Sequence, residues 1–213
     1  MYVYPFLYME QSKVATKTHK KDVIRQEIIA AANIYSQCLA GKTFLYVYGN
    51  NYFELSFPID RFLHLTGVSS RMSAVSFYRN AKKSKLTNAQ FGFDSKHLYA
   101  NAAKKLPCLK RLPELTNQMV CVLNNLQTMT ITYKIGVSNL EFTLGLIKEN
   151  MVFVPMTLRV EKSSVAKSQD GEIVDFIFCK DSSLCYYNQI SFQDCNKNIP
   201  SCVYSFLDPK LLT

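Results

Sequence analysis

Hydrophobic positions near the N-terminus recur at the spacing of an α-helix. One helical face collects Ile24, Ile28, Ala31, Tyr35 and Leu39. This pattern predicts an amphipathic helix that begins at Asp22, a suitable N-cap, and ends at Gly41. The polar and basic residues 10–21 before it predict a flexible lead-in.

The period then changes to that of strands. Residues 43–49 and 52–58 are rich in Tyr, Phe, Val and Leu, and they flank Gly49-Asn50-Asn51. These turn residues tolerate positive φ, so the pattern predicts a β-hairpin. Pro58 suits a first helical turn and Gly67 a helix end, which predicts a short helix over 59–66. Two further helices are predicted over 73–83 and 95–105, the last ended by Pro107.

The second half of the chain is patterned as strands joined by short polar loops. Five segments alternate or are β-rich: 120–124, 128–136, 140–147, 152–162 and 172–180. Short connections allow only antiparallel neighbours. The predicted fold class is therefore α+β, with N-terminal helices and a hairpin followed by a twisted antiparallel sheet of about four to five strands. We expect a lead-in over 1–21, a single domain over 22–181 and a C-terminal extension of loops and short helices over 182–213.

The positive charge of the protein is concentrated in one part of the chain. The 213 residues carry a formal net charge of +9, with 48% hydrophobic residues. Ten basic residues lie between Arg71 and Arg111 against the single acid Asp94, so this segment alone carries +9. A concentrated cationic surface favours a polyanion, with nucleic acid the first candidate and an anionic membrane the second. The alternative is a solvated helical face that serves solubility.

The seven cysteines form no CxxC pair, and the three histidines lie far from one another. This excludes the usual zinc-ligand spacings and favours scattered thiols in a reducing cytosol. No basic signal-peptide start and no apolar run of membrane-spanning length is present. We therefore expect a cytoplasmic protein with no metal, no cofactor and no membrane partner.

Alternation sorts the predicted sheet into faces. If residues 136–139 pair Ile135 with Leu140, Lys134 lies across from Glu141; if the next loop pairs Ile147 with Phe153, Glu141 lies across from Arg159. This register predicts a carboxylate between two cations, beside Thr143 and Thr157. The alternative is an ordinary set of surface pairs on a solvated sheet face.

Among the histidines, His64 is the strongest candidate for proton transfer. It lies in an apolar turn that ends in glycine, with Thr66 two residues after it and Arg61 three before. Metal-free RNA cleavage needs a base, an acid and cations around the phosphate, and these residue types supply all three. The alternative for His64 is a hydrogen-bonded core histidine.

Several blocks resemble one protein family when they are taken in order. They are TFLYVYGNNYFELSFPIDRFLHLTG (43–67), FYRNAKKSKLT (77–87), KKLPCLKRLPELTN (104–117), TITYKIGVSNLEFTLGL (130–146), VPMTLRVEKS (154–163) and DGEIVDFIF (170–178). Together they are similar to the fourth subgroup of the phage barnase–EndoU–colicin–RelE-like (BECR) nucleases. The similarity covers roughly residues 34–180. It implies a metal-independent RNase fold from phages or mobile elements, with helices followed by an antiparallel sheet.

The leading hypothesis is thus an RNA endonuclease of the phage or mobile-element toxin type, cleaving by 2′-hydroxyl attack on the phosphodiester. Its catalytic residues are predicted to be His64, Thr66, Glu141, Lys134 and Arg159. Its substrate-binding residues are predicted to be Arg61, Arg71, Arg79, Lys82, Lys83, Lys85, Asn139, Thr143 and Thr157. The expected partners are RNA, such as tRNA or rRNA, and an antitoxin, immunity or host protein.

Two other functions stay open from the sequence. A catalytically inactive nuclease-like fold can serve as a module that binds RNA or inhibits a host protein. Transfer of ADP-ribose from NAD would also suit a site with His, Thr and Glu, although no diagnostic motif supports it.

Overall fold

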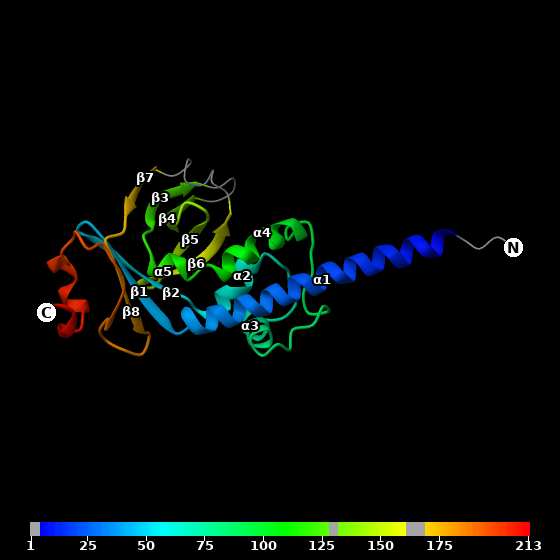
Figure 1. Cartoon of the computed structure of the whole chain (residues 1–213), viewed down its shortest axis with the longest axis horizontal. Coiled ribbons are helices and arrows are strands. Elements are labelled where there is room, and N and C mark those ends of the chain that lie inside the picture. The colour runs from blue at the N-terminus through cyan, green and yellow to red at the C-terminus, as the bar shows by residue number, and fades with distance from the viewer. Residues whose placement is uncertain (1–4, 128–131, 161–168) are drawn as a thin grey trace.

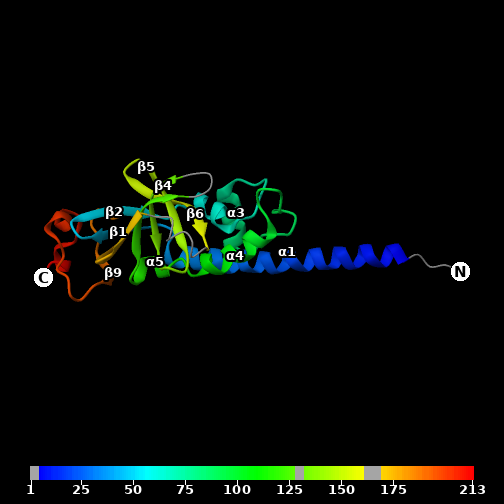
Figure 2. The same cartoon turned by 90° about the horizontal axis from the view of Figure 1, so that it is seen from above.

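One long helix organises the N-terminal half of the fold. The computed structural model describes residues 5–127, 132–160 and 169–213. Helix α1 (Pro5–Cys38) begins well before Asp22, and its N-terminal turns project from the rest of the molecule (Figures 1 and 2). Pro5 fits the first turn of a helix, and no Gly or Pro interrupts residues 6–38. The predicted lead-in is therefore helical from Pro5 onwards and continuous with the predicted helix.

The next elements follow the predicted order. Strands β1 (Lys42–Tyr48) and β2 (Asn51–Ser56) form the hairpin, with Gly49 at φ +53° in its turn. The short helices η1 (Ile59–Arg61) and α2 (Phe62–Thr66) end at Gly67, whose φ of +77° confirms the glycine cap. Helix α3 (Ala74–Lys82) is capped by the Ser73 hydroxyl, which accepts from the Ser76 N–H.

Helix α4 (Tyr99–Lys110) corrects the predicted helix 95–105 at both ends. Asp94 accepts hydrogen bonds from the N–H groups of Lys96 and His97, which fixes a turn where helix was expected. Pro107 lies inside α4 and does not end it. Its ring costs one backbone hydrogen bond, and burial of Leu106 and Leu109 on either side offsets that loss. The one-turn helix α5 (Glu114–Asn117) follows.

The described strands form one nine-stranded sheet in the order β7-β3-β4-β5-β6-β2-β1-β8-β9. The remaining seven have these bounds: β3 (Cys121–Gln127), β4 (Thr132–Ser138), β5 (Thr143–Glu149), β6 (Val152–Arg159), β7 (Gln169–Ile173), β8 (Phe176–Asp181) and β9 (Gln189–Gln193). The antiparallel meander β3-β4-β5-β6 confirms the α+β class. The sheet has more strands than predicted because the hairpin joins it, because the predicted strand 172–180 divides into β7 and β8, and because β9 forms in the segment predicted as loops and short helices.

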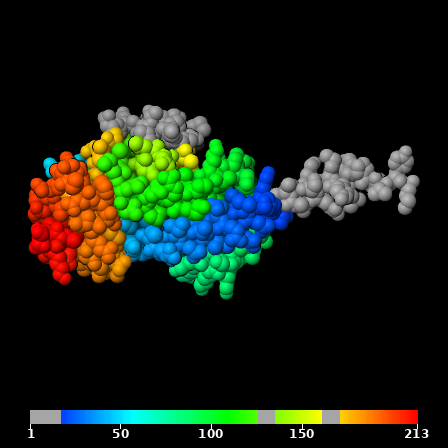
Figure 3. Space-filling model, in the orientation of Figure 1, coloured from blue at the N-terminus to red at the C-terminus, as the bar shows by residue number. Residues whose placement is uncertain are grey.

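The two halves of this sheet meet at a parallel seam. Strand β2 pairs with β6 at Leu55↔Phe153. Side chains close the seam, with the rings of Phe53 and Phe153 edge-to-face at 5.5 Å between centroids. The C-terminal part adds β9 and the short helices η2 (Ser201–Phe206) and η3 (Pro209–Leu211), which form one end of the molecule (Figure 3).

Two clusters of buried side chains stabilise the fold. The larger lies between the helices and one face of the sheet, with Tyr35, Phe62 and Phe77 among its fully buried members. The smaller lies under the C-terminal segment, where Tyr187 and Val203 pack on Phe176 and Phe178. The C-terminal extension is therefore part of the packed structure. No helix among the described residues is both long and apolar enough to span a bilayer.

Candidate active site

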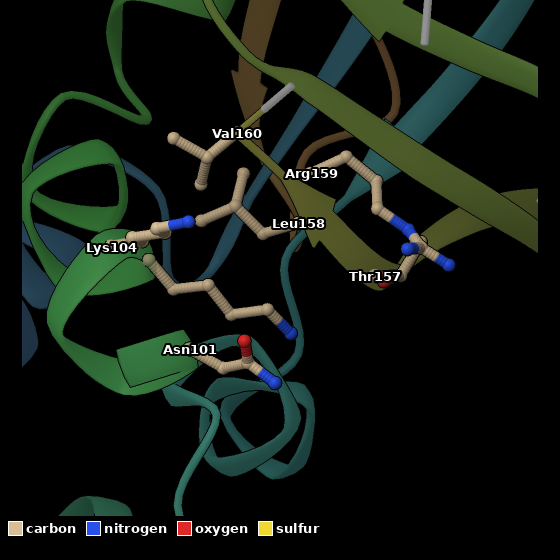
Figure 4. A pocket seen from close by; sticks show the side chains of 7 residues that line it. Asn101, Lys104, Thr157, Leu158, Arg159 and Val160 are labelled. Carbon is tan, nitrogen blue, oxygen red and sulfur yellow. The ribbon is translucent and has the colours of Figure 1, made fainter. Parts of the chain in front are cut away.

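A cationic pocket of about 460 Å³ opens between α4 and the end of β6. Asn101 and Lys104 project from α4, and Thr157, Arg159 and Val160 project from the end of β6 (Figure 4). Among the described residues, the lining consists of Asn101, Lys104, Lys105, Thr157, Leu158, Arg159 and Val160. Thr157 and Arg159 are two residues apart on a strand and so share a face.

Lys105 is held in this pocket by its packing on helix α2. A Cβ built on Gly67 would lie 3.1 Å from Lys105 Cδ and 3.4 Å from Ala102 Cα. The glycine that ends α2 therefore also leaves room for the lysine stem. Burial, and then the positive charge of Arg159, lowers the pKa of Lys105 below its usual value.

The charges of this pocket are not compensated by the described part of the protein. Among the described residues, none that lines the pocket is acidic, and Lys104, Lys105 and Arg159 form no ion pair. The Nε atom of Arg159 is buried and has no hydrogen-bond partner among the described residues. Two neighbouring cations repel each other, and an anion between them would relieve that repulsion. The arrangement is suited to binding a phosphate.

Helix α2 lies beside this pocket and carries His64. It packs against both α4 and β6. The side chain of His64 is exposed, so it is not the core histidine considered above. It is not among the residues that line the pocket. His64 stands three residues before Gly67, the residue beside the stem of Lys105. Three residues of an α-helix span about 5 Å along its axis.

Comparison of the whole sequence with known families gives one match. Residues 27–196 match the family described as phage-Barnase-EndoU-ColicinE5/D-RelE like nuclease4, PBECR4. The chain belongs to the PBECR4 family. No curated protein and no solved structure matches it. This family assignment agrees with the cationic character of the pocket.

Two of the site residues predicted from the sequence reach the pocket of this PBECR4 protein. They are Arg159 and Thr157. The contribution of α4 was missed, since Lys104 and Lys105 were counted only as part of the basic segment. A signal was present: Lys105 stands three residues after Ala102 and four before Leu109, on the buried stripe of α4. A lysine on an apolar helix face needs an explanation.

The predicted Lys134–Glu141–Arg159 register was wrong. Val137 pairs with Leu144 and Ser138 with Thr143, so Glu141 lies in the turn between β4 and β5. Arg159 pairs with Thr143. The carboxylate of Glu141 forms an ion pair with Arg111. The side chain of Lys134 lies outside the described residues.

Three other predicted site residues have structural contacts in this PBECR4 fold. The Thr66 hydroxyl is fully buried, donates to Leu63 O at 2.7 Å and accepts from Val68 N. The buried Thr143 hydroxyl donates to Ser138 Oγ at 3.0 Å. The Asn139 side chain accepts from the N–H groups of Glu141 and Phe142 and so shapes the turn.

The basic residues predicted to bind substrate divide among several surfaces. Arg61 forms an ion pair with Glu149 across the seam. Arg71 lines a cavity of about 650 Å³ beside the Ser69↔Gly92 bridge. Lys85 is exposed in the loop after α3. The remaining three line a groove between α1 and α3: Arg79, Lys82 and Lys83. Among the described residues, no three of His, Cys, Asp and Glu gather as a metal site.

Proposed function

We propose that this PBECR4 protein is an RNA endonuclease that binds the scissile phosphate in the pocket between α4 and β6. The observation that carries the proposal is the uncompensated pair Lys105 and Arg159 at an open pocket. Family membership supplies the nuclease class. The proposal further specifies RNA as the substrate and cleavage without a metal ion. It also specifies a role as a phage or mobile-element effector in the bacterial cytoplasm.

The proposed reaction is transesterification within the RNA. The 2′-oxygen attacks the phosphorus, the bond from phosphorus to the 5′-oxygen breaks, and a 2′,3′-cyclic phosphate and a 5′-hydroxyl result. Lys105 and Arg159 stabilise the negative charge that builds up on the phosphate oxygens. Asn101 and Thr157 supply neutral hydrogen-bond donors on the two sides of the pocket.

We assign proton transfer to His64. Its exposed imidazole, on a helix that contacts both walls of the pocket, is free to meet a bound substrate. A neutral imidazole has one ring nitrogen that can accept a proton and one that can donate a proton, which suits a group that takes one proton and returns another. The buried hydroxyl of Thr66 serves α2 itself, and Glu141 serves the turn between β4 and β5, so neither is retained in the proposed mechanism.

The test is cleavage of tRNA and rRNA by the purified full chain in the presence of EDTA. The expected products carry a 2′,3′-cyclic phosphate, and a 2′-deoxy substitution at the cut site abolishes cleavage. His64→Asn is expected to lower the rate by a factor of 10² to 10⁴. Arg159→Gln is expected to lower it through weaker stabilisation of the phosphate.

His97→Asn is the matched control for His64, because His97 is bound to Asp94 at the surface, outside the pocket lining. Equal activity of His64→Asn and the unchanged protein would refute the assigned role of His64. Tight RNA binding without any strand scission would instead assign the chain to the inactive binding modules. Expression in bacteria tests the effector role, since an active RNase should slow growth and the His64→Asn variant should not.

A further inference from the structure

A second cationic surface lies away from the proposed active site. We call it the α1–α3 groove. Its volume is about 510 Å³, and it is lined by Ser36, Ala40, Gly41, Ile59, Tyr78, Arg79, Lys82 and Lys83. The end of α1 forms one wall and the C-terminal half of α3 forms the other. Arg79 and Lys82 belong to α3 and Lys83 is its C-cap, so the two lysines stand three and four residues after Arg79.

These three side chains form one compact cationic row. Residues three and four apart on a helix are neighbours, with about 5–6 Å between their Cβ atoms. All three are exposed, and none forms an ion pair within the described residues. Asp60 on η1, which packs against α3, is an acid of the neighbouring element, and it is not part of the lining. The groove therefore carries a net positive charge.

One explanation that needs no ligand is compensation of the helix dipole. Basic side chains are favoured in the last turn of a helix, where carbonyl groups lack partners. Arg79 and Lys82 lie in the last turn of α3 and suit this role, but Lys83 at the C-cap and Lys85 in the loop continue the positive charge past the helix. Positive charge that continues past the end of the helix is more than the dipole requires.

The groove is separated from the pocket by α1. Figure 1 shows α4 on one side of α1 and α3 on the other, and in the space-filling view α1 is a band between them (Figure 3). A short oligonucleotide in the pocket would therefore not reach Lys82 or Lys83. A ligand that occupies both surfaces must be long or folded.

The character of the groove favours nucleic acid over a protein partner. Protein interfaces depend on large, desolvated apolar and aromatic anchors. None of the large exposed hydrophobic residues in the described part of the chain lines this groove. Its exposed side chains are the three cations, while the apolar part of the lining comes from the partly buried Ile59, the buried Tyr78 and the small residues Ala40 and Gly41. Such a surface matches the phosphates of one strand, which are recognised without regard to sequence.

We propose that the α1–α3 groove is a second RNA-binding site, which holds the backbone of a long or folded RNA while the pocket between α4 and β6 holds the scissile phosphate. This inference rests on the proposed function for the pocket. It assigns the groove to substrate selection: RNA that reaches both surfaces binds more tightly than RNA that fills the pocket alone.

The experiment compares Lys82→Gln/Lys83→Gln with the control Lys96→Gln/Lys210→Gln. Both variants lose two exposed positive charges, and neither control residue lines the pocket or the groove. Binding is measured with a fully 2′-O-methylated stem-loop RNA, which lacks the attacking hydroxyl and cannot be cut. The groove variant should lower the slope of log Kobs against log salt concentration by about 2, and the control should leave it near its original value.

Cleavage gives the second readout. For an unmodified stem-loop the groove variant should raise KM on the order of tenfold at moderate salt with kcat unchanged. For a dinucleotide, which fills only the pocket, both parameters should stay the same. An unchanged salt slope, or an equal loss in the control variant, overturns the groove proposal and leaves an acidic protein as the alternative occupant. Absence of cleavage in every protein overturns the proposed function, while the binding measurement still decides the groove.

Discussion

Gly67 has two separable tasks, and replacing it with alanine tests both. Its φ of +77° lets α2 end in the left-handed conformation, and its missing Cβ leaves room for the stem of Lys105. Gly49 is a matched reference, because its φ is +53° and an added Cβ there meets nothing within 4 Å. Gly49→Ala therefore measures backbone strain alone, and Gly67→Ala measures the strain together with displacement of the lysine.

The expected magnitudes follow from this geometry. The left-handed conformation costs a non-glycine residue about 1–2 kcal/mol, so each variant should melt roughly 2–8 °C below the unchanged protein. At Gly67 the new methyl group would stand 3.1 Å from Lys105 Cδ, so the flexible stem must shift by a few tenths of an ångström. Displacing a group that stabilises the transition state by well under 1 Å should cost on the order of tenfold in kcat/KM.

Calorimetry and cleavage of a short RNA give the two readouts. Both variants should lose similar stability, and only Gly67→Ala should lose activity when both are assayed well below their melting temperatures. Equal activity of the two variants would refute the argument that Gly67 positions Lys105. A loss of activity in Gly49→Ala would show that backbone strain alone explains the effect.

Three further variants test individual side chains. Thr66→Val should cost about 1 kcal/mol of stability through its lost backbone bonds and leave cleavage unchanged; an inactive but stable variant would return Thr66 to the chemistry. Lys105→Met should raise the melting temperature at neutral pH while weakening RNA binding. Burial, and then Arg159, lowers the pKa of Lys105, so the folded state binds this proton less tightly than the unfolded chain. The gain in melting temperature should therefore shrink as pH rises towards the ordinary lysine pKa, and a pH-independent gain would contradict this cause. Tyr187→Phe removes the 2.6 Å hydrogen bond to Glu54 and should cost about 1.5–3 kcal/mol in urea denaturation, with activity unchanged; no loss would show that the bond contributes little.

Local patterns in the sequence were sufficient for the hairpin, the short helix before Gly67 and α3, whereas the start of α1 and both ends of α4 were missed. The short helix before Gly67 and the turn at Gly49 depend on neighbouring residues, and both were predicted correctly. The sheet register was not predicted correctly, because side-chain hydrogen bonds in the turn decide it. Asn139 accepts two backbone hydrogen bonds and Leu140 takes a φ of +73°, so the turn ends later than alternation suggested and Ser138 pairs with Thr143.

The candidate site was only partly predictable for a related reason. Arg159 and Thr157 could be found because alternation on one strand fixes a shared face. The opposite wall of the pocket comes from α4, some fifty residues earlier in the chain, and no local pattern links the two. The division of the basic segment between α3 and α4, on two sides of α1, is likewise a property of helix packing.

The two proposed RNA-contacting surfaces lie on either side of the parallel seam between β2 and β6. The size of the side chains at this seam therefore affects the distance between the two surfaces. Arg159 stands on the β6 half of the sheet, while the α1–α3 groove adjoins Gly41, which leads into β1. At the seam, the rings of Phe53 and Phe153 act as a spacer between the halves. A larger or smaller residue there would change the angle between the halves, and with it the shape of RNA that fits both surfaces, without altering any residue that contacts the RNA.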